Sequence, residues 1–597
     1  MLKRTHHCGQ LRVEDVGQTV TLAGWVNNYR DHGGVIFIDL RDREGITQLV
    51  FHPENRQAHD LADKLRHEDV IAAVGKVVER GLDDKGRPLA NPKLATGEIE
   101  VQCHTLEVLN KAVTPPFTPD DAAKVGEELR LKHRYIDLRR GRMQQILRTR
   151  YRVTKTLRDY FDEQGFTEIE TPFLCKSTPE GARDFLVPSR LHPGAFYALP
   201  QSPQLFKQIL MVAGCERYLQ IVRCFRDEDP RADRQAEFTQ IDLEMSFVDQ
   251  QDVMQTVEGA MRRIWKQVLG VEIPPLRRMT YADAMDRYGS DRPDLRFGME
   301  LVDVGDLVAA TGFKVFTDAL SAGGVVKAIR VPGGAAMTRK QTDGLAEWVK
   351  QFGAGGLPLC KVEGGKLTTG VAKFVEPVTE ALVQRLEAAD GDLICFGVHA
   401  RKAIVARVLG ELRVRLGHEL KLIREGAWEW LWVIDFPLME YNEELNRWDS
   451  LHHPFTAPRD EDLHLLESDP SKVRSKAYDI VCNGSELGGG SIRIHDPRVQ
   501  GKIFNLLGID DAAAKVKFGF LLDALRYGAP PHGGLALGLD RIVMHLCGTS
   551  NIRDVIAFPK TQTGADLMTE APGEVDAMQL KELHLRVQTH AQPAKAV

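Results

Sequence analysis

The sequence predicts a multidomain α/β protein with an N-terminal β-barrel and a larger α/β part that carries an insertion. Three observations lead to this fold class. The 597 residues exceed what one hydrophobic core can hold, so several domains are expected. Alternation of apolar and polar residues dominates up to about Leu109, and helical periodicity follows it. Between about Tyr281 and Arg424, Gly-rich turns replace the dense charged motifs found on either side, which indicates an inserted α/β domain.

The first domain is predicted to be a small closed barrel. Val20–Val26 and Val35–Leu40 alternate, and the turn signal His32-Gly33-Gly34 separates them. A helix-like stretch near Gln57–Arg66 interrupts the strands, which is typical of a five-stranded barrel of the OB type. Within the second strand, Phe37 falls on the face opposite the apolar core positions. An outward aromatic there can stack on an unpaired nucleic-acid base, although cover by a neighbouring domain is the alternative.

A linker and a helix are expected after the barrel. The proline-bearing segment Thr114–Pro119 reads as stiff, and an arginine-rich amphipathic stretch, Leu129–Arg142, follows it. Apolar residues at helical spacing predict a helix over Ile146–Gln164. A strand is expected over Phe166–Thr171, ending at Pro172.

Composition excludes several classes of protein. The 43% hydrophobic and 27% charged residues are ordinary for a globular protein. A net charge of −6 gives no global basic signature, so DNA is not an expected partner and any RNA must be held by local patches. The nine cysteines are scattered singly, without zinc spacing. No signal peptide or membrane span is evident, so a cytoplasmic protein without membrane contact is expected.

The densest charged cluster is Phe225–Asp242. A predicted strand, Tyr218–Cys224, enters it and another, Phe238–Phe247, leaves it, so the cluster forms a charged hairpin. A solvated loop with surface ion pairs is the alternative. Against that alternative, the leaving strand carries Asp242 and Glu244 on one face between apolar residues, and a strand that presents carboxylates repeatedly usually lines a cleft. Arg226 can fork onto a phosphate group.

Two further clusters lie near the C-terminus. In Asp479–Arg493 a carboxylate on an apolar strand precedes what we expect to be a Gly-rich loop, and Asp479 with Glu486 is the pair expected to bind Mg²⁺. Such a loop is a weak signal by itself. In Gly533–Met544 glycines lead into a helix with Arg541 in its first turn, a suitable place for a nucleotide phosphate. A tight strand-to-helix turn inside a core is the alternative.

These three clusters, in this order, resemble the class II aminoacyl-tRNA synthetases. The segment ending in Pro172 resembles the family's first motif, which implies a homodimer; Phe225–Asp242 resembles the second and Gly538–Arg541 the third. HIGH and KMSKS, the class I signatures, do not occur. Gln201–Gln208 and the runs RDEDPRADRQAEFTQID and GSELGGGSIRIH resemble bacterial aspartyl-tRNA synthetases over the whole chain. The implied layout is an OB-fold anticodon-binding domain (1–110), a linker (111–140), an antiparallel-sheet catalytic domain (141–285 and 426–560), an inserted α/β domain (286–425) and a C-terminal extension (561–597).

The resemblance also implies the substrates, ATP and L-aspartate, and the residues that bind them. Lys207 and Arg493 would neutralise the aspartate side chain, and Arg226, Glu228 and Arg541 would be catalytic. The implied aspartate site comprises Glu180, Ser202, Gln204, Lys207, Arg226, Asp242, His452, His453 and Arg493. The implied ATP site comprises Arg226, Asp227, Glu228, Gln235, Phe238, Glu486, Gly538, Leu539, Asp540 and Arg541.

For the tRNA, the resemblance implies that Phe37, Gln48 and Glu100 read the anticodon. His32 and Gly81 resemble the non-discriminating subfamily, which charges both tRNA-Asp and tRNA-Asn with aspartate; a discriminating enzyme acting on tRNA-Asp only is the alternative. An asparaginyl or lysyl enzyme is a further rival, opposed by Lys207 and Arg493. A non-catalytic RNA-binding relative is opposed by the presence of Arg226, Glu486 and Arg541.

Overall fold

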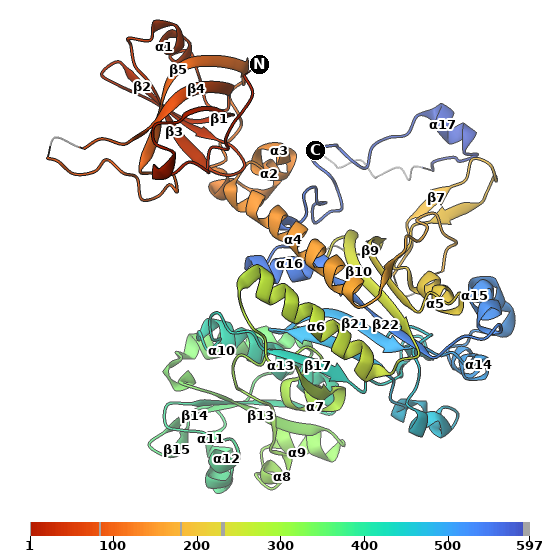
Figure 1. Ribbon diagram of the computed structural model, residues 1–597. Helices are drawn as coiled ribbons and strands as arrows, with labels where there is room; N and C mark the ends of the chain where they lie inside the picture. The colour runs from red at the N-terminus through yellow and green to blue at the C-terminus, as the bar shows by residue number, and fades with distance from the viewer. Residues whose placement is uncertain (1, 83–84, 179–181, 229–232, 589–597) are drawn as a thin grey trace. The chain divides into compact units, whose positions relative to one another are not determined.

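The computed structural model describes residues 2–82, 85–178, 182–228 and 233–588 (Figure 1). The chain divides into two compact units, which are described separately. The first comprises residues 1–152, 229–236 and 543–580, and the second comprises residues 153–228, 237–542 and 581–597. Of the helices in the described ranges, none combines the length and the apolarity needed to cross a membrane.

The first unit contains the predicted OB barrel. Its strands close in the order β1-β2-β3-β5-β4, and the alternate residues Ile36, Ile38 and Leu40 of the second strand are buried in the barrel core. The helix α1 (Arg56–Ala62) lies between the third and fourth strands in sequence. The five strands are β1 (Thr19–His32), β2 (Val35–Arg41), β3 (Ile46–Phe51), β4 (Val70–Glu79) and β5 (Ile99–Asn110).

Arginines after the barrel bind groups of the same unit. Arg134 is buried and donates hydrogen bonds of 2.9 Å to the backbone carbonyls of Arg553, Ile556 and Ala557. Arg139 pairs with Glu68 at 2.6 Å. The positive charge of this segment is therefore largely used inside the unit. The helices here are α2 (Glu127–Lys132), α3 (Arg134–Asp137), the beginning of α4 (Gly141–Glu163) and α17 (Ala577–Glu582), of which α4 and α17 continue into the second unit.

An eight-stranded sheet organises the second unit. Its order is β11-β17-β20-β21-β22-β10-β9-β6, and all neighbours are antiparallel except the two edge pairs. The strand predicted over Phe166–Thr171 is shorter, since only Thr167–Glu168 pairs. The strands are β6 (Thr167–Glu168), β9 (Arg217–Phe225), β10 (Glu237–Ser246), β11 (Arg277–Thr280), β17 (Trp430–Ile434), β20 (Ala477–Cys482), β21 (Ser485–Ile492) and β22 (His532–Gly538).

One face of this sheet is covered by α6 (Gln250–Leu269), which crosses the strands in Figure 1. A capping box at Asp249 begins the helix and Gly270, at φ 70°, ends it. The indole of Trp432 on β17 donates a 3.0 Å hydrogen bond to Glu258 of the helix. Trp265 of the helix is fully buried, and its ring meets that of Trp430 on β17 edge to face, with 4.7 Å between centroids. The opposite face of the sheet carries the polar residues described below.

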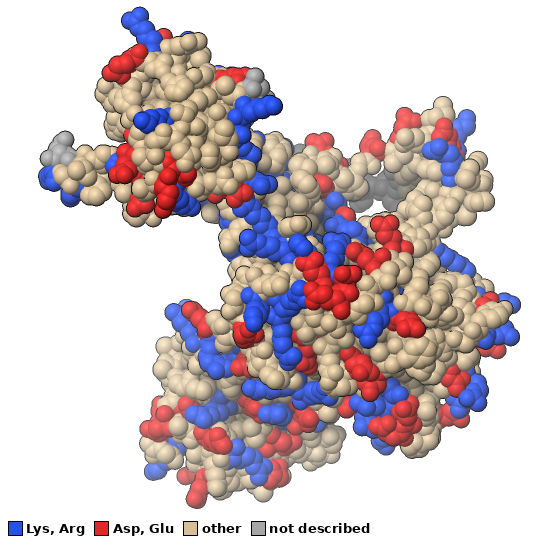
Figure 2. All heavy atoms as spheres, viewed as in Figure 1, with Lys and Arg blue, Asp and Glu red and all other residues tan. Residues whose placement is uncertain are grey.

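The insertion has its own five-stranded sheet, in the order β12-β13-β16-β14-β15, with an apolar core on each face. Acidic and basic side chains are interspersed over the visible surface of this domain in Figure 2. Its strands are β12 (Val302–Asp303), β13 (Val325–Val331), β14 (Leu359–Glu363), β15 (Lys366–Thr368) and β16 (Leu393–His399). Its helices are α8 (Gly305–Val308), α9 (Lys314–Ser321), α10 (Arg339–Trp348), α11 (Ala372–Val375), α12 (Thr379–Arg385) and α13 (Lys402–Glu419).

Shorter elements complete the second unit. A hairpin of β7 (Leu186–Pro188) and β8 (Phe196–Ala198) precedes the helix α5 (Gln204–Val212). The remaining elements are α7 (Tyr281–Tyr288), β18 (Met439–Asn442), β19 (Arg447–Ser450), α14 (Pro497–Leu506) and α15 (Asp511–Leu525).

A buried arginine fixes the last helix of the insertion to the segment before its first strand. Arg413 of α13 donates to the backbone carbonyls of Asp294 and Phe297, both at 2.8 Å, and of Gly298 at 3.1 Å. Its guanidinium also lies 4.1 Å from the centre of the Phe297 ring.

We therefore expect Arg413→Met to lower the free energy of unfolding by about 3 kcal/mol, because it leaves several buried carbonyls without donors. Urea unfolding followed by tryptophan fluorescence measures this. Arg339→Met is the matched control, since that side chain is 94% exposed. Equal unfolding midpoints for the two variants would contradict the anchoring role.

Candidate active site

One face of the large sheet carries two carboxylates with a strip of small residues between them, which we call the trough. Four residues lie in register across four neighbouring strands. They are Asp479 on β20, Gly489 on β21, Ala536 on β22 and Asp242 on β10. Because neighbouring strands lie about 4.8 Å apart, three steps separate the carboxylate-bearing strands by about 14 Å. The two residues between them, Gly489 and Ala536, are small.

The glycine run Gly488–Gly490 was expected to form a loop, and that expectation is wrong: all three residues lie in β21. A Cβ atom at Gly490 would lie 2.0 Å from the carbonyl oxygen of Gly534, and one at Gly489 would lie 2.4 Å from Oδ1 of Asp479. Glycine is depleted in strands, so the sequence pattern suggested a loop. The physical reason for these glycines is the close approach of β22 and of the Asp479 carboxylate.

A buried cluster of four charges lies at one side of the trough. Lys207, from α5, places Nζ 3.0 Å from Oδ1 of Asp242 and 3.3 Å from Oε2 of Glu244. Arg493, just after β21, binds Glu244 with both Nε and Nη2, at 2.9 and 3.0 Å. None of the four side chains is more than 2% exposed. Two cations and two carboxylates therefore compensate one another in the absence of a ligand.

The Arg493 guanidinium is held on two further sides. Nη1 donates to Nε2 of His453 at 2.8 Å and to Oγ of Ser491 at 2.7 Å. With the two bonds to Glu244, four of its five N–H groups are used among the described residues. Burial, together with the charge of Arg493, holds the pKa of His453 well below its ordinary value, so the ring stays neutral and can accept. One N–H remains for a ligand.

The two carboxyl groups of the cluster differ in pKa. Burial raises the pKa of Asp242 to about 6, against the lowering effect of Lys207. Burial also acts on Glu244, but the charges of Arg493 and Lys207 outweigh it and lower that pKa. Glu244 had no predicted role, although its spacing from Asp242 placed both on one face. A Cβ at Gly534 would lie 2.0 Å from Oε2 of Glu244, so this glycine makes room for the carboxylate.

Asp479 and Glu486, at the other side, suit a divalent cation. Oδ1 of Asp479 is buried and has no hydrogen-bond partner among the described residues. Burial and then the Asp479 charge raise the pKa of Glu486, so a cation would stabilise both ionised groups. Nε2 of His452 lies 3.8 Å from Oδ1 of Asp479. Burial lowers the pKa of His452, but the nearby Asp479 carboxylate outweighs burial and produces a net rise. Within the described ranges no group of three His, Cys, Asp or Glu residues suits a metal, so Mg²⁺ would need substrate oxygens as further ligands.

Side chains expected to hold a nucleotide follow β9, lie on β10 and begin α16 (Leu539–Cys547). The guanidinium of Arg226 lies 5.1 Å from the centre of the Phe238 ring. Arg541 donates a hydrogen bond to the carbonyl of Glu486. Asp540 is buried and accepts from the backbone N–H of Thr239 at 2.9 Å, so its carboxylate fixes the helix start to β10. Leu539 is likewise buried, and Gly538 is the last residue of β22.

The other expected site residues are distributed differently. The carboxamide Nε2 of Gln204 is buried without a hydrogen-bond partner among the described residues, as a group awaiting a ligand would be. Gln235 belongs to the first unit, where its Oε1 accepts from the backbone N–H of Lys560 at 2.9 Å. Glu180 lies outside the described residues. Glu228 is the last described residue before a gap, and the N–H of Asp227 donates to the carbonyl of Arg183 at 3.0 Å.

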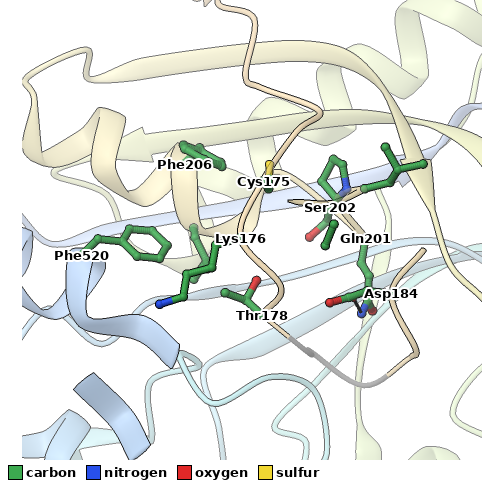
Figure 3. Close-up of a pocket in the computed structure, with 12 residues that line it drawn as sticks. Cys175, Lys176, Thr178, Asp184, Gln201, Ser202, Phe206 and Phe520 are labelled. Carbon is green, nitrogen blue, oxygen red and sulfur yellow. Dashed lines mark hydrogen bonds between the residues drawn. The ribbon is translucent and has the colours of Figure 1, made fainter. Parts of the chain in front are cut away.

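A cavity of about 250 Å³ opens beside the start of α5 (Figure 3). Leu205, Phe206 and Phe520 supply apolar walls, and Gln201 and Ser202 supply polar groups. Ser202, expected in the aspartate site, thus lies at the border between this cavity and the helix that carries Lys207.

The residues expected to contact the anticodon belong to the barrel. Gln48 donates to Oε2 of Glu100 at 2.9 Å, and burial raises the pKa of Glu100. The rings of His32 and Phe37 meet edge to face with centroids 6.1 Å apart. At Gly81 an added Cβ atom would meet open space. Four of the five residues are thereby joined as two contacting pairs on the barrel.

The chain is similar to known proteins over nearly its whole length. Residues 126–562 match the family of class II tRNA synthetases (D, K and N), and residues 20–109 match the OB-fold nucleic acid binding domain. The chain is 53% identical over 589 residues to the aspartate–tRNA(Asp/Asn) ligase of Caldanaerobacter subterraneus subsp. tengcongensis, covering 98% of both chains. It is 56% identical over 590 residues to the enzyme of that name from Desulfatibacillum aliphaticivorans, again covering 98% of both.

Another relative has a name that does not mention tRNA-Asn. The chain is 55% identical over 592 residues to the aspartate–tRNA ligase of Bacillus licheniformis, covering 98% of this chain and 99% of that one. Among solved structures, asparaginyl-tRNA synthetase from Pyrococcus horikoshii with asparaginyl-adenylate matches with a TM-score of 0.59 and 20% identity, over 94% of this chain and 99% of that one. That likeness shows the fold. With the family match extending over most of the chain, this protein belongs to the class II tRNA synthetases of the D, K and N group.

Proposed function

We propose that this protein is an aspartate–tRNA ligase. It would activate L-aspartate with ATP, releasing pyrophosphate, and transfer the aspartyl group to tRNA-Asp and tRNA-Asn. The observation that carries the proposal is the buried pair of cations, Lys207 and Arg493, held by Glu244 beside the open trough. The names of the full-length relatives support the same activity.

The two cations would select aspartate over asparagine. Each cation keeps an N–H group after binding the protein carboxylates, and that N–H group can donate a hydrogen bond to the side-chain carboxylate of aspartate. An asparagine amide would leave two buried charges without a partner, and sites built on such partners reject the wrong ligand by about 10⁴. Asp242, Ser202 and Gln204 would meet the α-ammonium group. His452, His453 and Glu180 complete the proposed amino-acid site.

The nucleotide would lie toward β10 and the start of α16. Arg226 would hold the α-phosphate and the aspartate α-carboxylate together, so that the carboxylate oxygen attacks phosphorus. Phe238 offers a ring for the adenine, and Arg541 offers charge for the γ-phosphate. Asp227, Glu228, Gln235, Gly538, Leu539 and Asp540 form or support the rest of this proposed site. Catalysis would rest on positioning and on charge stabilisation rather than on a protein nucleophile.

Asp479 and Glu486 would hold Mg²⁺. The bound ion would neutralise charge on the phosphates as pyrophosphate leaves. The protein's part is to hold both carboxylates at the same side of the trough, with His452 beside Asp479.

The barrel would bind the anticodon through Phe37, Gln48 and Glu100. His32 and Gly81 would permit either last anticodon base, in agreement with the Asp/Asn names of two relatives. We also propose that the chain forms a homodimer through the segment from α4 to Pro172. The proposed domains are the anticodon-binding domain (1–110), the linker (111–140), the catalytic domain (141–285 and 426–560), the inserted domain (286–425) and the C-terminal extension (561–597). A cytoplasmic location is proposed as well. All nine cysteines are free, which suits a reducing compartment.

Replacing Arg226 by Ala should lower aspartate-dependent pyrophosphate exchange by at least about 10³, because charge on the α-phosphate then has no fixed donor. Binding of tRNA should stay within about threefold, since the substitution leaves the barrel untouched. Arg223→Ala is the control: it lies three residues before Arg226, on β9, and pairs with Glu237. Exchange retained in the Arg226 variant would refute the assigned role.

The aspartate site should weaken in acid. Ionised Asp242 is needed for the α-ammonium group, and its pKa is raised to about 6. The KM for aspartate should therefore be constant above that pH and rise about tenfold per pH unit below it. Burial and the charge of Arg493 lower the pKa of His453. Exchange kinetics between pH 5 and 8 measure this, and a flat profile that also survives Asp242→Asn would exclude Asp242 from the site.

The rate at which tRNA-Asn is charged should lie within about tenfold of the rate for tRNA-Asp, a difference that corresponds to about 1.4 kcal/mol. His32→Leu should slow tRNA-Asn selectively, because a bulky apolar side chain would restrict the base beside Phe37. His104→Leu, at an exposed position on β5, is the matched control. Wild-type charging of tRNA-Asn that is slower by about 10³ or more would establish the discriminating alternative.

A further inference from the structure

Gln201 joins a segment of the chain that lies between the two proposed substrate sites. Its Nε2 donates to the carbonyl of Ala182 at 2.8 Å, and its Oε1 accepts from the N–H of the same residue at 3.2 Å. The carboxamide therefore pairs with the backbone as a neighbouring strand would. Only 7% of Gln201 is exposed, so these bonds are shielded from water.

The same carboxamide also holds an acidic side chain. Nε2 donates to Oδ1 of Asp184 at 2.5 Å, and Oδ2 of Asp184 accepts from Oγ of Ser177 at 2.8 Å. Figure 3 shows the side chains of Gln201 and Asp184 meeting at the border of the cavity. Every polar atom of the Gln201 side chain is thereby used to fix residues 182–184.

The opposite side of residues 182–184 is bound to the proposed ATP loop. The N–H of Asp227 donates to the carbonyl of Arg183 at 3.0 Å, and Nε of Arg183 donates to the carbonyl of Asp227 at 3.4 Å. Asp227 lies between Arg226 and Glu228 in sequence, whereas Gln201 precedes Ser202. One short segment thus connects the start of the amino-acid site to the start of the ATP site.

We propose that Gln201 is a positioning residue that couples the binding of aspartate to the binding of ATP through residues 182–184. It touches neither substrate. A ligand that orders Ser202 and its neighbours also orders the Gln201 carboxamide, which fixes the 182–184 segment and with it the backbone of Asp227. The second ligand then binds a loop that is already ordered, so its affinity rises, and by linkage the effect is reciprocal. The inference rests on the proposed function.

The test is a thermodynamic cycle with the full chain. The Kd of L-aspartate is measured by calorimetry without and with saturating α,β-methylene-ATP, whose methylene group blocks release of pyrophosphate. The ratio of the two values is the coupling. Wild type should give a ratio of about 5 or more, within the range usual for coupled sites. Gln201→Leu should reduce it to below about 2.

A second pair of variants distinguishes a positioning role of Gln201 from a general loss of stability. In Gln201→Glu a carboxylate faces Asp184 and the Ala182 carbonyl, so the coupling should disappear. Adding Asp184→Asn removes the like charge and supplies a donor, and should raise the ratio again by at least about twofold. Phe520→Leu, which alters the same cavity without a bond to residues 182–184, should keep the wild-type ratio.

The outcomes are distinct. A wild-type ratio of one, an undiminished ratio in Gln201→Leu, or the absence of rescue by Asp184→Asn would overturn the inference. Those results would leave the proposed ligase activity intact, because aspartate-dependent pyrophosphate exchange by the wild-type protein tests that activity separately.

Discussion

The bidentate pairing of Glu244 with Arg493 is the interaction on which the amino-acid site depends. A buried guanidinium without a partner would cost several kcal/mol, and so would the buried carboxylate. Together with Lys207 and Asp242 they form a compensated set of charges in which each side chain fixes its neighbour. The site is therefore preorganised before any substrate arrives, which reduces the ordering cost of binding.

This cluster in turn constrains the sheet beneath it. Gly534 makes space for the Glu244 carboxylate and Gly489 for the Asp479 carboxylate. The strands can carry so many small residues because α6 covers the other face, where Trp265 and Trp432 supply the buried apolar area. Stability thus comes from one side of the sheet, and the other side is left for polar residues that would be unfavourable in a core.

Much of the fold class was predictable because the spacing of apolar residues along the sequence indicates which side of a strand or helix is buried. The alternation in Val35–Leu40 and the helical spacing before Gln164 both correspond to elements of the structure. The Gly488–Gly490 run was misjudged as a loop, since the cause of its glycines lies on other strands and leaves no local signal. Glu244 was predicted to share a cleft-lining face with Asp242, but no binding role was predicted for it. Its importance comes from Arg493, which is far away in sequence, and only the fold brings the two together.

The insertion also affects the order in which the chain can fold during synthesis. β11 precedes it and β17 follows it, yet these strands are parallel neighbours in the large sheet. The pair can form only after the whole intervening domain has been made. If the insertion were disordered, pairing β11 with β17 would require closing a long loop at a cost in entropy. The insertion instead folds on its own two cores, and α13 packs against α7, so its two ends are already close together. The insertion would then act as an internal scaffold that shortens the search for the last strands of the sheet.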